Sequence, residues 1–174
     1  MKSPLALESN ILFIDDETDL LEVLTFQIKD FVKKCFTASS ASEGLKILET
    51  EKIDLVVTDF KMPEMNGVEL IAAIRQLHPG IPILMLTGFR EETAILKALT
   101  QDLFDVVEKP IRPEGLIQRI QNGLLEGHLL EQLSVYYLAH AKVEDRLQYE
   151  KADANEQRKQ LYSMAGMLPR IRHK

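Results

Sequence analysis

The stretch 53–63 (IDLVVTDFKMP) constrains the fold of this chain more than any other segment. An apolar, β-branched run ends in Asp59 and is followed by a short loop that contains Pro63. Such a run is typical of a strand buried inside a parallel sheet. Open α/β sheets carry their functional groups at the carboxyl ends of the strands. Asp59 is therefore predicted to lie at a functional edge.

Other apolar runs of the chain also end in polar residues. They are 11–14 before Asp15 and Asp16, 81–86 before Thr87, and 106–107 before Glu108 and Lys109. If these runs form neighbouring parallel strands, their polar residues meet at one edge of the sheet. The sequence thus places carboxylates, a hydroxyl and an ammonium group together.

Strand-like runs alternate with segments of helical periodicity along the first two thirds of the chain. The predicted strands are 11–14, 34–38, 53–59, 81–86 and 105–108, and the predicted helices are 15–31, 40–48, 68–77, 91–100 and one that opens at Pro113. This alternation predicts an α/β fold, with a flavodoxin-like, doubly wound five-stranded parallel sheet in the order 2-1-3-4-5 and five helices. His78 is predicted to end a helix, without a catalytic role.

Composition and charge exclude several classes of protein. The 174 residues suffice for one full domain and a short appendage. The single cysteine, Cys35, rules out an internal disulfide framework and a cysteine zinc site. The sequence shows no signal pattern and no apolar run of the roughly 20 residues that span a bilayer, so we expect a cytoplasmic protein without membrane contact. Residues 1–126 carry 13 Lys and Arg against 21 Asp and Glu, which argues against DNA binding.

Residues 127–174 show no sixth strand and are predicted to form a helical extension of a domain that spans residues 1–126. A heptad-like stripe consists of Leu129, Leu133, Tyr136, His140, Val143 and Leu147, and a shorter amphipathic piece covers 157–168. The stripe is short for a coiled coil. The extension is interpreted as a dimerisation helix, a partner-binding helix, a segment that folds back on the first domain, or a linker of a longer protein.

The predicted edge has a definite chemistry. Asp15, Asp16 and Asp59 would repel one another without a counter-ion, which favours a hard divalent cation with oxygen ligands, Mg²⁺ above all. Thr87 and Lys109 add a hydrogen-bond donor and a cation, so that a phosphoryl group fits the site and a carboxylate is its nucleophile. Taken singly, the same residues also suit helix starts, turns and a solvated surface charge.

Four segments in order resemble the receiver domain of two-component response regulators. They are Asp15-Asp16, residues 58–63 with Gly67, Leu86-Thr87-Gly88, and residues 105–110 (DVVEKP). The resemblance covers residues 9–126 and does not include the extension. It implies a phospho-accepting switch, with at most slow self-dephosphorylation, whose partner is a sensor histidine kinase or a histidine phosphotransfer protein.

The resemblance also implies a role for each matching residue. Asp59 would accept the phosphoryl group, Thr87 would donate its hydroxyl to it, and Lys109 would pair with it. Mg²⁺ would be bound by Asp16, by Asp59 and by the backbone carbonyl of Lys61, and by Asp15 through water. These roles are expectations from the family pattern.

Three departures from the family pattern concern switching. Val106 stands three residues before the lysine, where most receivers have Tyr or Phe, so the usual aromatic switch is absent or relocated. Phe104 replaces a small residue and is predicted to pack in the core. Phe89 and Lys61 flank the expected path of an attacking water, and a bulky Phe89 is predicted to slow dephosphorylation.

The same residues also bear on other functions. A phosphorelay intermediate without its own output, or a receiver fragment of a longer regulator, is an alternative that no residue excludes. A phosphatase of the haloacid-dehalogenase type needs an acid two residues past the nucleophile, where this chain has Lys61. A flavin-binding flavodoxin is disfavoured because the loop after residues 11–14 is acidic. The favoured function is a response regulator that signals through its extension to itself or to an unknown output protein.

Overall fold

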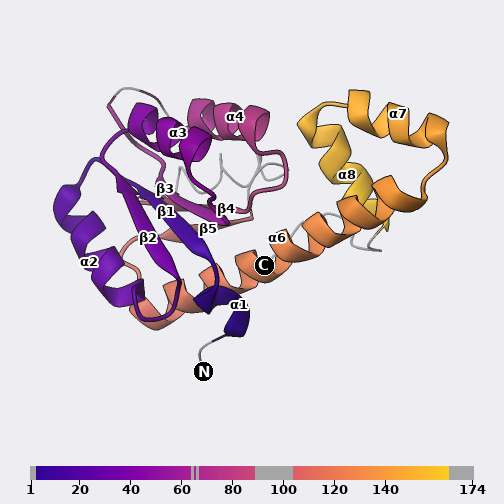
Figure 1. Cartoon of the computed structure of the whole chain (residues 1–174). Helices are drawn as coiled ribbons and strands as arrows, with labels where there is room; N and C mark the ends of the chain where they lie inside the picture. Colours follow the sequence, from indigo (N-terminus) through magenta and orange to yellow (C-terminus); the bar gives the residue numbers. More distant parts are fainter. Residues whose placement is uncertain (1–2, 64, 66, 89–103, 165–174) are drawn as a thin grey trace.

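The computed structural model describes residues 3–63, 65, 67–88 and 104–164, and these contain the predicted five-stranded parallel sheet. The strands are β1 (Asn10–Ile14), β2 (Lys34–Ala38), β3 (Leu55–Asp59), β4 (Ile83–Thr87) and β5 (Asp105–Glu108). They lie in the order β2-β1-β3-β4-β5, and each neighbouring pair is parallel (Figure 1). The predicted fold class and strand order are therefore confirmed.

Helices cover both faces of the sheet. They are α1 (Pro4–Leu7), α2 (Thr18–Ile28), α3 (Ala41–Thr50), α4 (Gly67–Leu77), α6 (Pro113–His140), α7 (Val143–Lys151) and α8 (Ala154–Met164). In Figure 1, α3 and α4 lie above the sheet, the first half of α6 lies below it, and α2 is at the left. Helices α2 and α6 pack into the same core. The predicted helix at 91–100 lies outside the described residues. No helix in the described ranges is both long and apolar enough to cross a membrane.

Alternation along the strands builds a separate core on each face. Phe13 and Val57 pack with α2 and α6, whereas their neighbours Leu12 and Val56 pack with α3 and α4. Successive side chains of a strand point to opposite faces, so each strand supplies both cores. Because both faces are covered, the central strands are apolar throughout, and only their ends carry polar side chains.

Small residues let α6 run close to the sheet. A Cβ on Gly123 would lie 2.7 Å from Leu55 and 3.2 Å from the ring of Phe104, and a Cβ on Gly127 would lie 2.9 Å from the ring of Pro82. Phe104 packs against the core on the α6 side, as predicted. The approach of Gly127 to Pro82 carries α6 past the amino end of β4.

The extension consists of the second half of α6 with α7 and α8. The predicted stripe through 129–147 is wrong as one continuous helical seam, because α6 ends at His140 and α7 begins at Val143. Ala141 and Lys142 have extended backbone angles, which redirect the chain. The apolar residues that are buried instead are Leu130, Tyr149 and Leu161, one from each helix.

The extension folds back toward the amino edge of the sheet. In Figure 1, α7 and α8 lie beyond the sheet on the side of α4, and α8 makes contacts with both α4 and α6. A cavity of about 400 Å³ is lined by residues of both parts, among them Asp54, Pro82, Gly127 and Arg158. Of the arrangements that the sequence left open, the chain adopts one in which the extension packs against the first domain.

Candidate functional site

Asp15 combines a structural and a chemical role at the end of β1. Its backbone N–H donates to the carbonyl of Ala38 at 3.1 Å, so the ladder between β1 and β2 continues to this residue. Its Oδ1 accepts from the backbone N–H of Glu17 at 2.9 Å, immediately before α2. Its side chain is 2% exposed and pairs through Oδ2 with Lys109. Asp15 therefore helps to start α2 and also belongs to the predicted cluster.

Asp59 is the last residue of β3 and is held at both carboxylate oxygens. Oδ2 accepts from the backbone N–H of Lys61 at 3.0 Å, and Oδ1 lies 2.8 Å from Nζ of Lys109. The next residue, Phe60, still donates to Leu86 of β4 at 2.9 Å. The pairing of β3 with β4 therefore continues past Asp59 and places this residue beside the end of β4.

Lys109 joins the two buried carboxylates. Its Nζ lies 2.9 Å from Asp15, 2.8 Å from Asp59 and 3.8 Å from Glu17. Its backbone N–H donates to the carbonyl of Thr87 at 2.7 Å, so Lys109 and the buried Thr87 share one level of the sheet edge. The strand ends thus bring Asp15, Asp59 and Lys109 into contact, with Thr87 at the same level of the sheet edge.

Burial and charge pairing shift two pKa values in the cluster. Burial raises the pKa of Asp15 above its usual value, and the hydrogen bond from Lys109 offsets only part of this shift. Burial also lowers the pKa of Lys109, but its hydrogen bonds to Asp59 and Asp15 and the attraction of their negative charges together outweigh burial, so the pKa lies above its usual value. Lys109 therefore remains an ammonium group at neutral pH.

The cluster suits a divalent cation. One carboxylate oxygen from each of Asp15, Asp16 and Asp59 lies within 4.8 Å of the others. Three carboxylates and the ammonium of Lys109 leave about two negative charges, the number that one divalent cation neutralises. Asp16 is exposed, whereas Asp15 and Asp59 are buried, so a cation can enter from the Asp16 side. Magnesium prefers such oxygen ligands and retains part of its water shell.

The residues predicted to affect switching lie in different places. Val106 is half-buried on β5 and packs with the α3 and α4 core. The backbone N–H of Lys61 reaches Asp59, but the structure does not test the predicted role of its carbonyl. Phe89 lies outside the described residues.

Two groups near the cluster or in the extension were not predicted. Glu17 approaches Lys109 at 3.8 Å with a side chain that is 69% exposed. The acidic run 15–17 was the available signal for it. In the extension, the buried Arg158 lies 3.7 Å from Glu126 of α6, and the hydroxyl of Tyr162 donates a hydrogen bond to the carboxylate of Glu126. No local pattern marks that network.

Together, the fold and site define an open α/β domain that holds an acidic, lysine-bridged cluster at the carboxyl edge of its sheet. Comparison with known families matches residues 11–121 to the response regulator receiver domain. The chain therefore belongs to the family of response regulator receiver domains. Members of this family are regulatory switches, generally without enzymatic activity, and typically bind Mg²⁺ through acidic residues.

Individual relatives agree with this assignment. The transcriptional regulatory protein GlrR of Escherichia coli is 34% identical over 116 residues, which are 67% of this chain and 26% of that protein. The response regulator SaeR of Staphylococcus aureus is 32% identical, over 67% of this chain and 50% of its own length. The crystal structure of a receiver domain protein from Clostridium thermocellum superposes with a TM-score of 0.64 at 32% identity, covering 70% of this chain and 98% of that one. This chain thus spans a quarter to a half of the two regulators.

Proposed function

We propose that this protein is a response regulator that accepts a phosphoryl group on Asp59 and signals through its helical extension. The supporting observation is the position of Asp59, whose Oδ1 lies 2.8 Å from Lys109 within a cluster that also contains Asp15 and Asp16. The donor is a phosphohistidine on a sensor histidine kinase or a histidine phosphotransfer protein, since receiver domains act with such partners.

In the proposed reaction, a carboxylate oxygen of Asp59 attacks phosphorus and forms a P–O bond while the P–N bond to histidine breaks. The departing histidine nitrogen keeps the electron pair of that bond. Bound Mg²⁺ would supply charge neutralisation for the phosphoryl oxygens, with Asp15, Asp16, Asp59 and the carbonyl of Lys61 as its protein ligands or water-mediated contacts. Lys109 forms an ion pair with Asp59 and, in this proposal, pairs with the phosphoryl group after transfer.

Thr87 and Val106 suggest how the phosphorylated state is transmitted. Thr87 ends β4 at the level of Lys109, and we assign its hydroxyl to a phosphoryl oxygen. Val106 is β-branched and has few rotamers, so it cannot swing as an aromatic ring would. The signal then passes through backbone movement after Thr87. Residues 1–126 serve as the receiver and 127–174 as the output element in this proposal.

The direct test is phosphoryl transfer to the full-length chain. Incubation with acetyl phosphate and Mg²⁺ is expected to add one phosphoryl group, seen by intact-mass spectrometry, and Asp59→Asn is expected to add none. Asp54→Asn is the matched control, because Asp54 precedes the same strand at its opposite end and bonds to Asn10. If Asp59→Asn is phosphorylated as fast as the wild type, or if Asp54→Asn alone blocks the reaction, the assignment of Asp59 is wrong.

A second measurement separates signalling from relay. Light scattering with Mg²⁺, with and without beryllofluoride as a phosphoryl mimic, reports whether the state of Asp59 changes the assembly of the chain. A mass or affinity change that is absent in Asp59→Asn supports an output through the extension. A chain that takes up and passes on the phosphoryl group with no such change would be a relay intermediate.

A further inference from the structure

Helix α7 carries apolar residues on two opposite faces. Its inner face contributes Tyr149, which is 6% exposed and packs with Leu130 and Leu161. Its outer face carries Val143 and Leu147, one helical turn apart, which are 72% and 46% exposed. Within the described part of the chain, these two side chains remain largely uncovered. Paired apolar residues on an outer helix face indicate a contact surface more than single exposed residues do.

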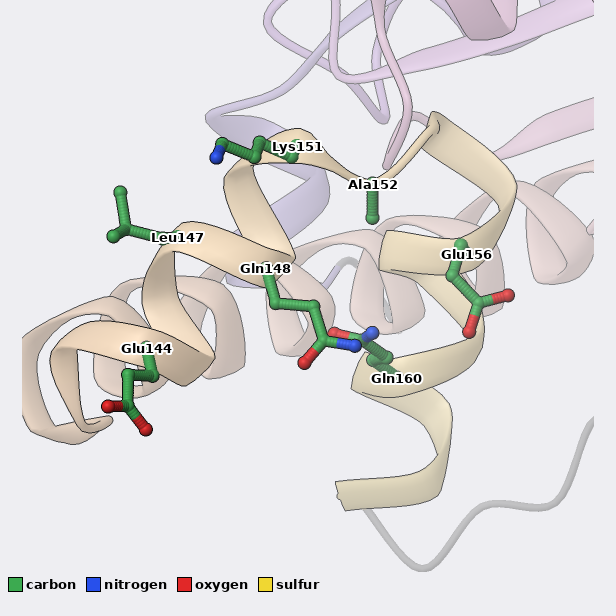
Figure 2. Close-up of a pocket in the computed structure, with 7 residues that line it drawn as sticks. All are labelled: Glu144, Leu147, Gln148, Lys151, Ala152, Glu156 and Gln160. Carbon is green, nitrogen blue, oxygen red and sulfur yellow. The ribbon is translucent and has the colours of Figure 1, made fainter.

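Opposite charges flank this outer face. Glu144 lies three residues before Leu147 and Lys151 lies four residues after it, so all three share one side of α7. They also line a groove of about 600 Å³ between α7 and α8. Figure 2 shows Gln148 extending toward Gln160 of α8, with Glu144, Leu147 and Lys151 along α7. The face thus has an apolar centre with an acid at one end and a base at the other.

We infer that this face binds the same face of a second copy of the chain, with the two α7 helices antiparallel and a two-fold axis beside Leu147. Such an axis places residues before Leu147 opposite residues after Leu147 of the other copy. Glu144 then faces Lys151 of the partner subunit, offset by one residue, or about 1.5 Å along the helix. The same pairing occurs twice, as a self-complementary interface requires.

The second copy is favoured over an unrelated partner by this symmetry. A different protein would need its own matching charges, whereas this chain already supplies both halves of each ion pair. One helix and its groove form a small contact, so we expect a weak dimer that depends on concentration. The inference rests on the proposed function only in treating the extension as the output element. The contact itself requires no phosphoryl group.

Charge reversal tests the arrangement in the full-length chain. In sedimentation velocity over a range of concentrations, Glu144→Lys and Lys151→Glu are each expected to weaken dimerisation by about tenfold or more, because each brings like charges together twice. An equimolar mixture of the two variants is expected to dimerise again, since the mixed pair has opposite charges at both contacts. Leu147→Lys is expected to abolish the dimer. Leu125→Lys is the control, because Leu125 is a 63% exposed leucine on α6, outside this face.

The outcomes separate this inference from the proposed function. A wild-type chain that is monomeric at all concentrations, with and without Mg²⁺ and beryllofluoride, overturns the dimer. A dimer that is insensitive to Leu147→Lys, or whose charge variants do not recover on mixing, overturns this surface and points to another partner or face. A chain that shows the charge exchange but no phosphoryl uptake on Asp59 rejects the proposed function alone.

Discussion

The two edges of the same sheet differ in the kinds of contact that they make. At the carboxyl edge, buried carboxylates are bridged by Lys109 at 2.8 and 2.9 Å, and an acidic cluster opens to solvent at Asp16. At the amino edge, Pro82 meets Gly127 of α6, and a cavity of about 400 Å³ lies between the sheet and the extension. One edge concentrates charge, and the other makes close apolar contact.

The two edges also differ in how they relate to the family match. The family match ends at residue 121, within the first half of α6. The carboxyl edge lies entirely inside that match. The contacts of Gly127 and the extension lie beyond it. The acidic cluster therefore lies within the part of the chain that matches the family, whereas the extension lies outside that match.

The largest expected effect comes from removing the ammonium group of Lys109 at the carboxyl edge. Lys109→Gln leaves Asp15 and Asp59 close together without their ammonium partner, and we expect a loss of about 2–3 kcal/mol in the free energy of unfolding without Mg²⁺. Added Mg²⁺ is expected to restore part of this loss by binding the folded state. Urea unfolding with and without Mg²⁺ measures both.

Lys52→Gln is the matched control at the amino edge. The Lys52 side chain is 80% exposed and lies 3.8 Å from Asp54. Exposed pairs contribute little, so the change is expected to cost less than about 0.5 kcal/mol and to show no dependence on Mg²⁺. Equal losses in the two variants would show that burial of the carboxylates does not distinguish the edges.

A smaller effect is expected from crowding the amino edge. The Cβ of Gly127→Ala meets the ring of Pro82 at 2.9 Å, and a proline ring cannot turn aside. Overpacking outweighs the better helix propensity of alanine, and we expect a net loss of about 1 kcal/mol in the free energy of unfolding.

Gly115→Ala in the same helix is the control for Gly127→Ala. A Cβ at Gly115 meets no atom within 4 Å, so helix propensity alone acts and stability is expected to rise by up to about 1 kcal/mol. Chemical denaturation of the two variants gives both signs. Gains of the same size at both positions would mean that α6 does not press on Pro82.

The sequence predicted the carboxyl edge better than the amino edge for a physical reason. Strands such as β3 are short, locally encoded runs, and topology alone brings their ends together, so Asp59 and Lys109 were predicted as neighbours. Which of two adjacent acids is buried depends on the ladder from β1 to β2, in which Asp15 still takes part. The sequence alone therefore does not show which of Asp15 and Asp16 is buried.

The extension was predicted less well because its signals are not local. Ala141 and Lys142 include neither Gly nor Pro, so no breaker marked the end of α6 at His140. The burial of Tyr149 depends on Leu130 and Leu161, which are distant in sequence. Heptad-like spacing therefore selected Val143 and Leu147, which lie on the outer face of α7.

The smallest expected effect is a dependence of stability on pH, which tests the burial of Tyr162 in the extension. Burial raises the pKa of the Tyr162 phenol, Glu126 raises it further, and Arg158 opposes both. The folded chain thus keeps this phenol protonated at a pH where the unfolded chain has lost the proton. The resulting stability is complete below the ordinary tyrosine pKa of about 10 and is lost as the pH rises above it. Thermal unfolding between pH 8 and about 11 should show this decline.

Two variants separate ionisation from packing in that measurement. Tyr162→Phe is expected to reduce the alkaline decline, while the lost hydrogen bond to Glu126 costs about 0.5–1.5 kcal/mol at neutral pH. Tyr136→Phe removes a hydroxyl from a ring that is 64% exposed and should leave neutral-pH stability unchanged. A decline of the same size in Tyr162→Phe and the wild type would place the titrating group elsewhere. Lys109 would then be the next candidate. Because its pKa is raised, it loses its proton, and with it its ion pairs, only at alkaline pH.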